Sequence, residues 1–149
     1  MKRVALSCAI VAVAIAAAAF ATTGSAQSRP VTSLHLISTT QEFIGFAPEH
    51  HQLRPGDRVG TGDAITGDDT GIDRVICTVI DKQPRAMCTA VAQLSKGTLT
   101  AESLVSAGPG ETHYAITGGT GAYEGASGTA VVTDIPGTAK ADIQITLLP

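Results

Sequence analysis

The sequence predicts an all-β fold of eight short antiparallel strands, and two observations lead to that prediction. After residue 26 no stretch shows the apolar spacing of an amphipathic helix, whereas the apolar–polar alternation of half-buried strands recurs at short intervals. Clusters of Gly, Pro, Asp and Ser separate these stretches, as turns between antiparallel strands require. Eight such strands form either a sandwich or a closed barrel, and their spacing does not choose between the two.

The eight expected strands follow one another with mostly short connections. Asp69-Thr70-Gly71 is a strong turn signal between the second and the third strand. Residues 41–54 lack regular alternation, and we expect them to form a long loop or a short flap. The expected strands are 31–38, 58–68, 72–81, 85–94, 97–105, 113–117, 126–134 and 141–148.

Residues 1–26 have the features of a secretory signal peptide. A basic pair, Lys2-Arg3, precedes an almost unbroken apolar run over residues 4–20, and small residues at 24–26 suit cleavage. The apolar run is near the lower length limit for spanning a bilayer, so an uncleaved anchor is the alternative. We expect a cleaved peptide and a protein that is secreted, extracellular or periplasmic.

The mature chain, residues 27–149, is expected to be a single domain, and its charge argues against nucleic acid as a partner. Once Lys2 and Arg3 are removed, 8 of the 10 basic residues remain against 13 acidic ones. Nucleic acid is usually bound by a basic surface. The sequence has no run of Lys or Arg that would favour a membrane surface either, and it has no Trp for stacking on sugars or bases.

Two cysteines remain after cleavage, Cys77 and Cys88, and an even pair in an exported chain indicates a disulfide. If Lys82 and Gln83 form the tip of a hairpin, the two cysteines lie directly opposite each other on neighbouring strands. That places them within the range that a bridge needs. A redox or metal-binding pair is the alternative, but neither a Cys-x-x-Cys motif nor a cluster of histidines supports it.

Residues 116–128, Ile-Thr-Gly-Gly-Thr-Gly-Ala-Tyr-Glu-Gly-Ala-Ser-Gly, form the densest glycine cluster of the chain. Its spacing is close to a dinucleotide-binding fingerprint. Only 21 residues follow Gly128, however, which leaves no room for the rest of an α/β sheet. We therefore interpret the cluster as a tight loop between two strands, in which glycines are free to adopt positive φ.

This cluster and its flanking strands resemble the dirigent proteins and the related allene oxide cyclase barrels. The signature of that family is matched by Thr120, Tyr123 and Ala126 and by the glycines Gly118, Gly119, Gly121 and Gly128. The resemblance implies a closed eight-stranded antiparallel β-barrel, which can be filled by its own side chains or hold one small ligand. It also implies no dedicated cofactor, and a homodimer or trimer.

The family confines a reactive apolar molecule and steers its cyclisation, isomerisation or coupling, and the resemblance implies a small apolar ligand here too. An enzyme of this kind would be a cofactor-independent isomerase or cyclase. The alternative is a non-catalytic exported module with a filled barrel whose surface serves interaction or assembly. Ala86, Ala90 and Ala92 fit either a roomy cavity or close packing. The interior volume should distinguish a ligand-binding barrel from a filled one, because a ligand site needs a few hundred Å³.

Four residues are candidates for the barrel pocket: Arg74, His113, Tyr114 and His35. Arg74 lies on the apolar face of its expected strand, where it could orient a planar anion, or else it packs its stem and holds its head in solvent. His113 and Tyr114 point to opposite faces, so at most one faces the interior, where it could act as an acid, a base or a donor. His35 has no visible partner and is as consistent with packing or a surface position.

No metal site is predicted. The adjacent histidines of the stretch 49–57 point in different directions on an extended chain and lack zinc-motif spacing. An acidic group later in the chain lacks the glycine and terminal glutamate of a calcium loop, so we expect solvated carboxylates in turns. These two groups are Glu49, His50, His51 and Asp57, and Asp63, Asp68, Asp69 and Asp73.

Overall fold

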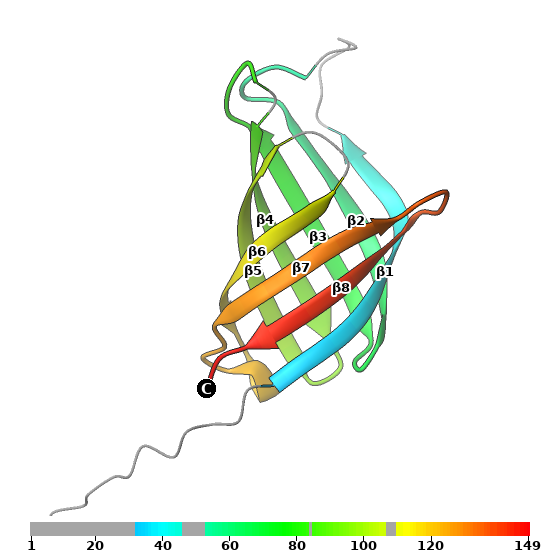
Figure 1. Ribbon diagram of the computed structural model, residues 1–149, viewed down its shortest axis with the longest axis vertical. Helices are drawn as coiled ribbons and strands as arrows, with labels where there is room; N and C mark the ends of the chain where they lie inside the picture. Colours follow the sequence, from blue (N-terminus) through cyan, green and yellow to red (C-terminus); the bar gives the residue numbers. More distant parts are fainter. Residues whose placement is uncertain (1–31, 46–52, 84, 107–109) are drawn as a thin grey trace, which may run out of the picture.

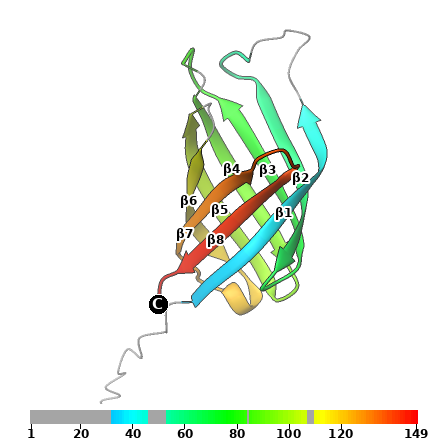
Figure 2. The same cartoon turned by 45° about the vertical axis from the view of Figure 1, so that its right-hand side comes forward.

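The structure is a computed structural model that describes residues 32–45, 53–83, 85–106 and 110–149. It is a closed barrel of eight antiparallel strands in which neighbours in sequence are neighbours in space and β8 pairs with β1 (Figures 1 and 2). The predicted all-β barrel is therefore confirmed. The strands are β1 (Thr32–Gly45), β2 (Arg58–Gly67), β3 (Gly71–Val79), β4 (Arg85–Leu94), β5 (Gly97–Ser106), β6 (Glu111–Gly119), β7 (Gly128–Ile135) and β8 (Lys140–Leu147), with one 3-10 helix, η1 (Gly121–Tyr123).

The first strand is longer than predicted. β1 continues to Gly45 through residues that were expected to be irregular, with a shift in its register against β2 between Thr40 and Glu42. A bulge of this kind interrupts the apolar–polar alternation while the strand stays paired, which is why the pattern missed it. The rest of the expected loop from 46 to 52, with its two histidines, and the predicted signal peptide lie outside the described residues.

Alternation along each strand fills the lumen with apolar side chains, and this core lies towards the end of the barrel that carries η1, at the bottom of Figure 1. Among the described residues, no helix is long and apolar enough to cross a membrane. The buried core residues include Leu36, Ile65, Leu94, Leu99, Ile116 and Ile145.

A single carboxylate holds that end of the barrel closed. Asp69, in the β2–β3 turn, accepts hydrogen bonds from the Tyr123 hydroxyl at 2.6 Å and from the Ser95 hydroxyl at 2.5 Å. The backbone N–H of Thr70 donates to it as well, at 2.7 Å. Ser95 belongs to the β4–β5 turn and Tyr123 to η1, so Asp69 joins three turns that are far apart in sequence. The hydrogen bonds from Ser95 and Tyr123 lower the pKa of Asp69 far below its ordinary value.

The glycine signature is explained by close contacts at this closed end. A Cβ on Gly119 would lie 2.3 Å from the carbonyl oxygen of Tyr123 and 2.7 Å from that of Thr98. Gly121 has φ +64, which favours glycine, and a Cβ there would approach the carbonyl oxygen of Lys96 to 2.6 Å. The glycines therefore let the chain around η1 pack directly onto the neighbouring β4–β5 turn.

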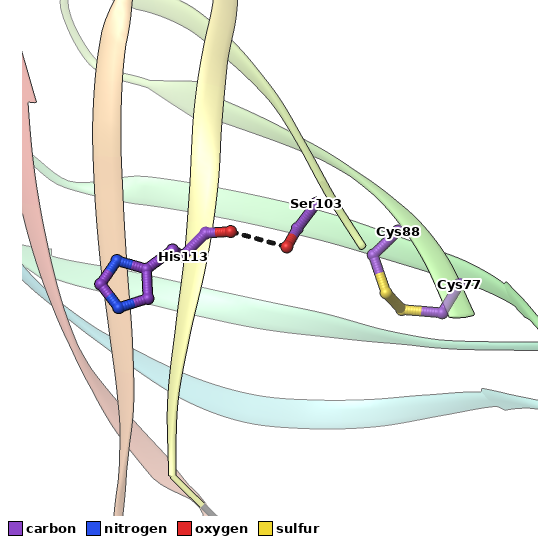
Figure 3. Close-up of a disulfide and its surroundings, with 4 residues drawn as sticks. All are labelled: Cys77, Cys88, Ser103 and His113. Carbon is purple, nitrogen blue, oxygen red and sulfur yellow. Dashed lines mark hydrogen bonds between the residues drawn. A yellow bond between two sulfur atoms is a disulfide. The ribbon is translucent and has the colours of Figure 1, made fainter. Parts of the chain in front are cut away.

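The predicted disulfide is present. Cys77 on β3 and Cys88 on β4 are direct cross-strand partners, with their Cα atoms 4.0 Å apart (Figure 3). Cys88 is buried, with 1% of its surface exposed. Ser103 is the β5 partner of Cys88, and its hydroxyl donates a hydrogen bond to the carbonyl oxygen of His113 at 2.6 Å. The bridge and this hydrogen bond connect four consecutive strands, β3 to β6.

The outer wall of β3, β4 and β5 carries an unusual number of large apolar side chains. Met87 is 58% exposed and lies opposite Leu104, which is 57% exposed. The inner face of β3 contains Asp73 in addition to Val75. We call these outward-facing residues the outer patch: Ile72, Ile76, Ile80, Met87, Val91 and Leu104.

Replacing Gly119 by alanine tests the role of the signature. We expect Gly119→Ala to lower the free energy of unfolding by more than about 3 kcal/mol, because its Cβ meets two backbone carbonyls. Gly118→Ala is the matched control, since a Cβ there meets only the Thr100 hydroxyl, at 3.3 Å, and should cost less than about 1 kcal/mol. Urea denaturation measures both, and equal losses would contradict the assignment.

Candidate functional site

The barrel encloses a cavity of about 80 Å³ to which all eight strands contribute side chains. Its lining is apolar except for Asp73 and Tyr114, and it includes Ala90 and Ala92, whose small side chains leave the space open. The volume is below the few hundred Å³ that a complete small-molecule site needs. The enclosed part of the lumen is therefore large enough for one end of a ligand only.

A second, wider pocket of about 500 Å³ lies where β1 and β2 face the β7–β8 turn. We call it the rim pocket. It is more polar than the cavity, and it is lined by Ser38, Thr40, Phe43, Thr61, Asp63 and residues 134–141. A ligand that occupied both spaces would have a site within the usual size range.

Asp63 and Asp73 are neighbours that line different spaces. They are direct cross-strand partners on β2 and β3, and each is only 7% exposed. Asp73 lines the cavity, whereas Asp63 lines the rim pocket. The Oδ1 atom of each is buried without a hydrogen-bond partner, while Oδ2 of Asp63 accepts a 3.3 Å hydrogen bond from the Thr61 hydroxyl. Unpartnered buried carboxyl oxygens are costly, which marks this pair as a functional candidate.

Asp73 keeps its proton to a higher pH than an ordinary carboxyl group does. Burial, the negative charge of Asp63 and a hydrogen bond to Asp63 together raise the pKa of Asp73 to about 7. Two carboxylates in one apolar site cannot both ionise easily, so the pair retains one proton that the separate residues would release. One group is then an acid and the other a base.

Tyr114 adds a hydroxyl group to the same cavity. It lies on the inner face of β6, and burial raises the pKa of its phenol, with a smaller contribution from the charge of Asp73. The phenol therefore stays protonated and can donate a hydrogen bond. Tyr114 and His113 do occupy opposite faces of their strand, and Figure 3 shows the His113 ring directed away from the disulfide side of β6.

The other three residues singled out in the sequence lie on the outside of the barrel. Arg74 forms an exposed ion pair with Glu42, at 2.9 Å, and the His113 ring lies 3.7 Å from Glu111. His35 is paired with Asp142, whose hydrogen bond and charge raise the pKa of the imidazole. None of the three lines the cavity, and the reason for Arg74 is that its face of β3, which it shares with Ile72 and Ile76, is the outer one.

The expectation of solvated carboxylates was wrong for Asp63, Asp69 and Asp73, which are all buried. One sequence feature points to the correct face. Asp73 is four residues before Cys77 and therefore shares its face of β3, and a bridge to Cys88 places that face on the alanine-rich side of β4. Across the residues that the structure describes, no three His, Cys, Asp or Glu side chains gather as a metal ion would require.

Comparison with solved structures supports the barrel. A pyocyanin demethylase superimposes with a TM-score of 0.70 at 22% identity, over 78% of this chain and 99% of the other. Two pterocarpan synthase dirigent proteins give TM-scores of 0.63 and 0.57 at 19% and 20% identity, over 82% and 78% of this chain and 97% and 85% of theirs. No protein-family model and no curated protein sequence matches the chain. At these identities the likeness establishes a dirigent-like fold.

Stability should depend on pH through Asp73. The folded state keeps a proton that the unfolded chain releases, so its contribution is full below about pH 4 and is lost as the pH rises through about 7. We expect the free energy of unfolding to fall by about 2 kcal/mol between pH 5 and 8. Asp73→Asn should remove most of that fall.

Urea denaturation at several pH values measures this slope. His35 also makes the free energy of unfolding decrease as the pH rises, because its pKa is raised in the folded state. The comparison that matters is therefore between the wild type and Asp73→Asn. Glu124→Gln, at an exposed carboxylate, is the control and should keep the wild-type slope. Parallel profiles for the wild type and Asp73→Asn would refute the shared proton.

Proposed function

We propose that this protein is an exported barrel that binds a small apolar molecule and moves a proton on it without a dedicated cofactor. The observation that carries this proposal is the buried Asp63–Asp73 pair, in which Asp73 lines an apolar cavity and Asp63 lines a wider pocket. A ligand with its apolar end in the cavity would bring its central atoms to the two carboxyl groups.

A pair with one proton suits isomerisation or cyclisation. The ionised carboxylate takes a proton from a carbon of the ligand, and the electron pair of the broken C–H bond forms a new double bond. The protonated carboxyl group delivers its proton to a second atom of the ligand. One proton is taken and one is given, so the pair ends with its proton on the opposite residue and no co-reactant is consumed.

Tyr114 and the apolar lining would assist this step in different ways. The phenol of Tyr114 can donate a hydrogen bond to an oxygen of the ligand on which negative charge develops. The apolar side chains around it hold the ligand in one conformation and exclude water, which favours one ring closure or double-bond position over others.

The similar solved structures support small-molecule chemistry in this barrel, and the disulfide supports export. The names of the similar structures denote a demethylase of pyocyanin and synthases of pterocarpans, so barrels of this fold host small-molecule chemistry. The Cys77–Cys88 bridge is compatible with an extracellular or periplasmic protein. We infer export from this bridge together with the signal-peptide features of residues 1–26.

Exchange of α-protons of a small aryl ketone tests the proton transfer. In D₂O near neutral pD, we expect the wild type to accelerate deuterium uptake by acetophenone above the buffer rate, as followed by NMR. Asp63→Asn and Asp73→Asn should each lower the acceleration by about 100-fold or more, because the pair then lacks either its base or its acid. Glu124→Gln is the control. No acceleration by the wild type, or full activity of both Asn variants, would contradict the proposed function.

The outer patch favours a second candidate function, self-association, alone or together with ligand binding. Large exposed apolar patches are uncommon on monomers, and closed homo-oligomers are the common solution. A groove of about 540 Å³ crosses this patch, and its charged residues are Arg58 and Arg74, whereas the whole chain has a net charge of −3. A second copy of the chain, presenting acidic surface, suits the groove.

Light scattering of the mature protein after size-exclusion chromatography tests self-association. We expect a dimer or trimer for the wild type and a monomer for the double variant Met87→Lys/Val91→Lys, because two buried ammonium groups would oppose the contact. Thr129→Lys, at an exposed position of β7, should leave the mass unchanged. A monomeric wild type would exclude this candidate.

A further inference from the structure

The charged groups that line the lumen are almost all acidic. Asp73 lines the cavity, and Asp63 and Asp134 line the rim pocket. In the described part of the chain, no Lys, Arg or His lines the cavity, and Lys140 is the one basic residue that lines the rim. Lys140 is the first residue of β8, and strand β1 lies between β8 and the strand β2 that carries Asp63.

Other basic side chains are held away from the lumen by partners of their own. The Arg74 guanidinium is paired with Glu42 on the outer wall. Arg85 donates from Nε to Asp81 at 2.6 Å at the tip of the β3–β4 hairpin, and the Lys96 ammonium donates to the carbonyl oxygen of Asp68 at 3.2 Å at the closed end. Among the described residues, no cationic side chain lines the cavity beside the Asp63–Asp73 pair, and Arg74, whose charge lowers the pKa of Asp73, acts from the outer face of β3.

This arrangement determines which ligands can bind well. A pair that holds one proton carries one net negative charge, and two of its buried oxygens accept no hydrogen bond. A cationic group with N–H donors would neutralise the charge and donate hydrogen bonds to the carboxyl groups, in a medium where both effects are strong. A carboxylate in the same place would add a second negative charge and leave the oxygens unsatisfied.

We propose that the barrel selects a ring compound that carries a cationic nitrogen, with the ring in the apolar cavity and the nitrogen against Asp63 and Asp73, and that it rejects the corresponding carboxylates. This inference rests on the proposed binding function and narrows its ligand class. The cavity of about 80 Å³ limits the enclosed part to a small ring, and the wider rim pocket holds any further substituent.

Three probes with the same phenyl ring test the selection: benzylamine, benzyl alcohol and benzoate. Each is titrated into the ¹⁵N-labelled mature protein at neutral pH, and the amide shifts of cavity residues such as Ala90, Ala130 and Ile145 report occupancy of the lumen. We expect benzylamine to bind at least about tenfold more tightly than benzyl alcohol, and benzoate to leave these amides unshifted.

Variants then show whether the acidic pair causes the preference. Asp63→Asn and Asp73→Asn should each lower benzylamine affinity by about tenfold and leave benzyl alcohol affinity nearly unchanged, because only the charge is removed. Asp68→Asn, outside the lumen in the β2–β3 turn, is the matched control and should change neither affinity. Equal binding of all three probes, or tighter binding of benzoate, overturns this inference and leaves the binding function standing. No shift with any probe overturns both.

Discussion

The register between β2 and β3 is the constraint on which the site depends. Asp63 and Asp73 face each other across these strands because the turn that joins them fixes the pairing. A slip of one residue would turn every side chain of a strand to the opposite face, and the carboxyl group would leave the lumen. Asp69 holds that turn in place through its hydrogen bonds to Tyr123 and Ser95. The glycine-rich loop, although far from the carboxyl pair, thus contributes to its geometry.

A buried pair of acids is tolerated because several independent interactions stabilise the surrounding barrel. The closed sheet has no free edge, the Cys77–Cys88 bridge connects β3 to β4, and the hydrogen bonds of Asp69 connect three turns. Functional sites often keep groups that lower stability, which the rest of the fold offsets. Here the destabilising groups are Asp63 and Asp73, which face the lumen.

The parts of the fold that local chemistry determines were predictable from the sequence. Apolar–polar alternation was sufficient to predict the strands, and the symmetric placing of Cys77 and Cys88 about a hairpin tip was sufficient to predict the disulfide. The glycine signature was sufficient to predict the closed barrel. The bulge in β1 was not predictable, because it shifts the alternation without a turn residue. Arg74 was misplaced for a related reason: its face of β3 carries Ile72 and Ile76 but points outwards, so these apolar side chains indicated the wrong side.

The carboxyl pair was missed because aspartates close to a turn are usually solvated, and only closure of the barrel buries these two. Asp73 lies an even number of residues from Cys77 and therefore shares the inner face of β3 with it. Asp63 can be recognised only through its pairing with Asp73. The size of the cavity depends on all eight strands at once. Such properties follow from the assembled barrel and have no local sequence pattern.

Titration of the aspartate side-chain carboxyl carbons by ¹³C NMR tests the shared proton most directly. A pair that retains one proton in the apolar lumen predicts a resonance that titrates near pH 7, and this transition should disappear in Asp73→Asn. If every aspartate of the folded protein titrated below about pH 5, as ordinary carboxyl groups do, the pair would be fully ionised at neutral pH. The acid–base role of Asp63 and Asp73 would then be contradicted.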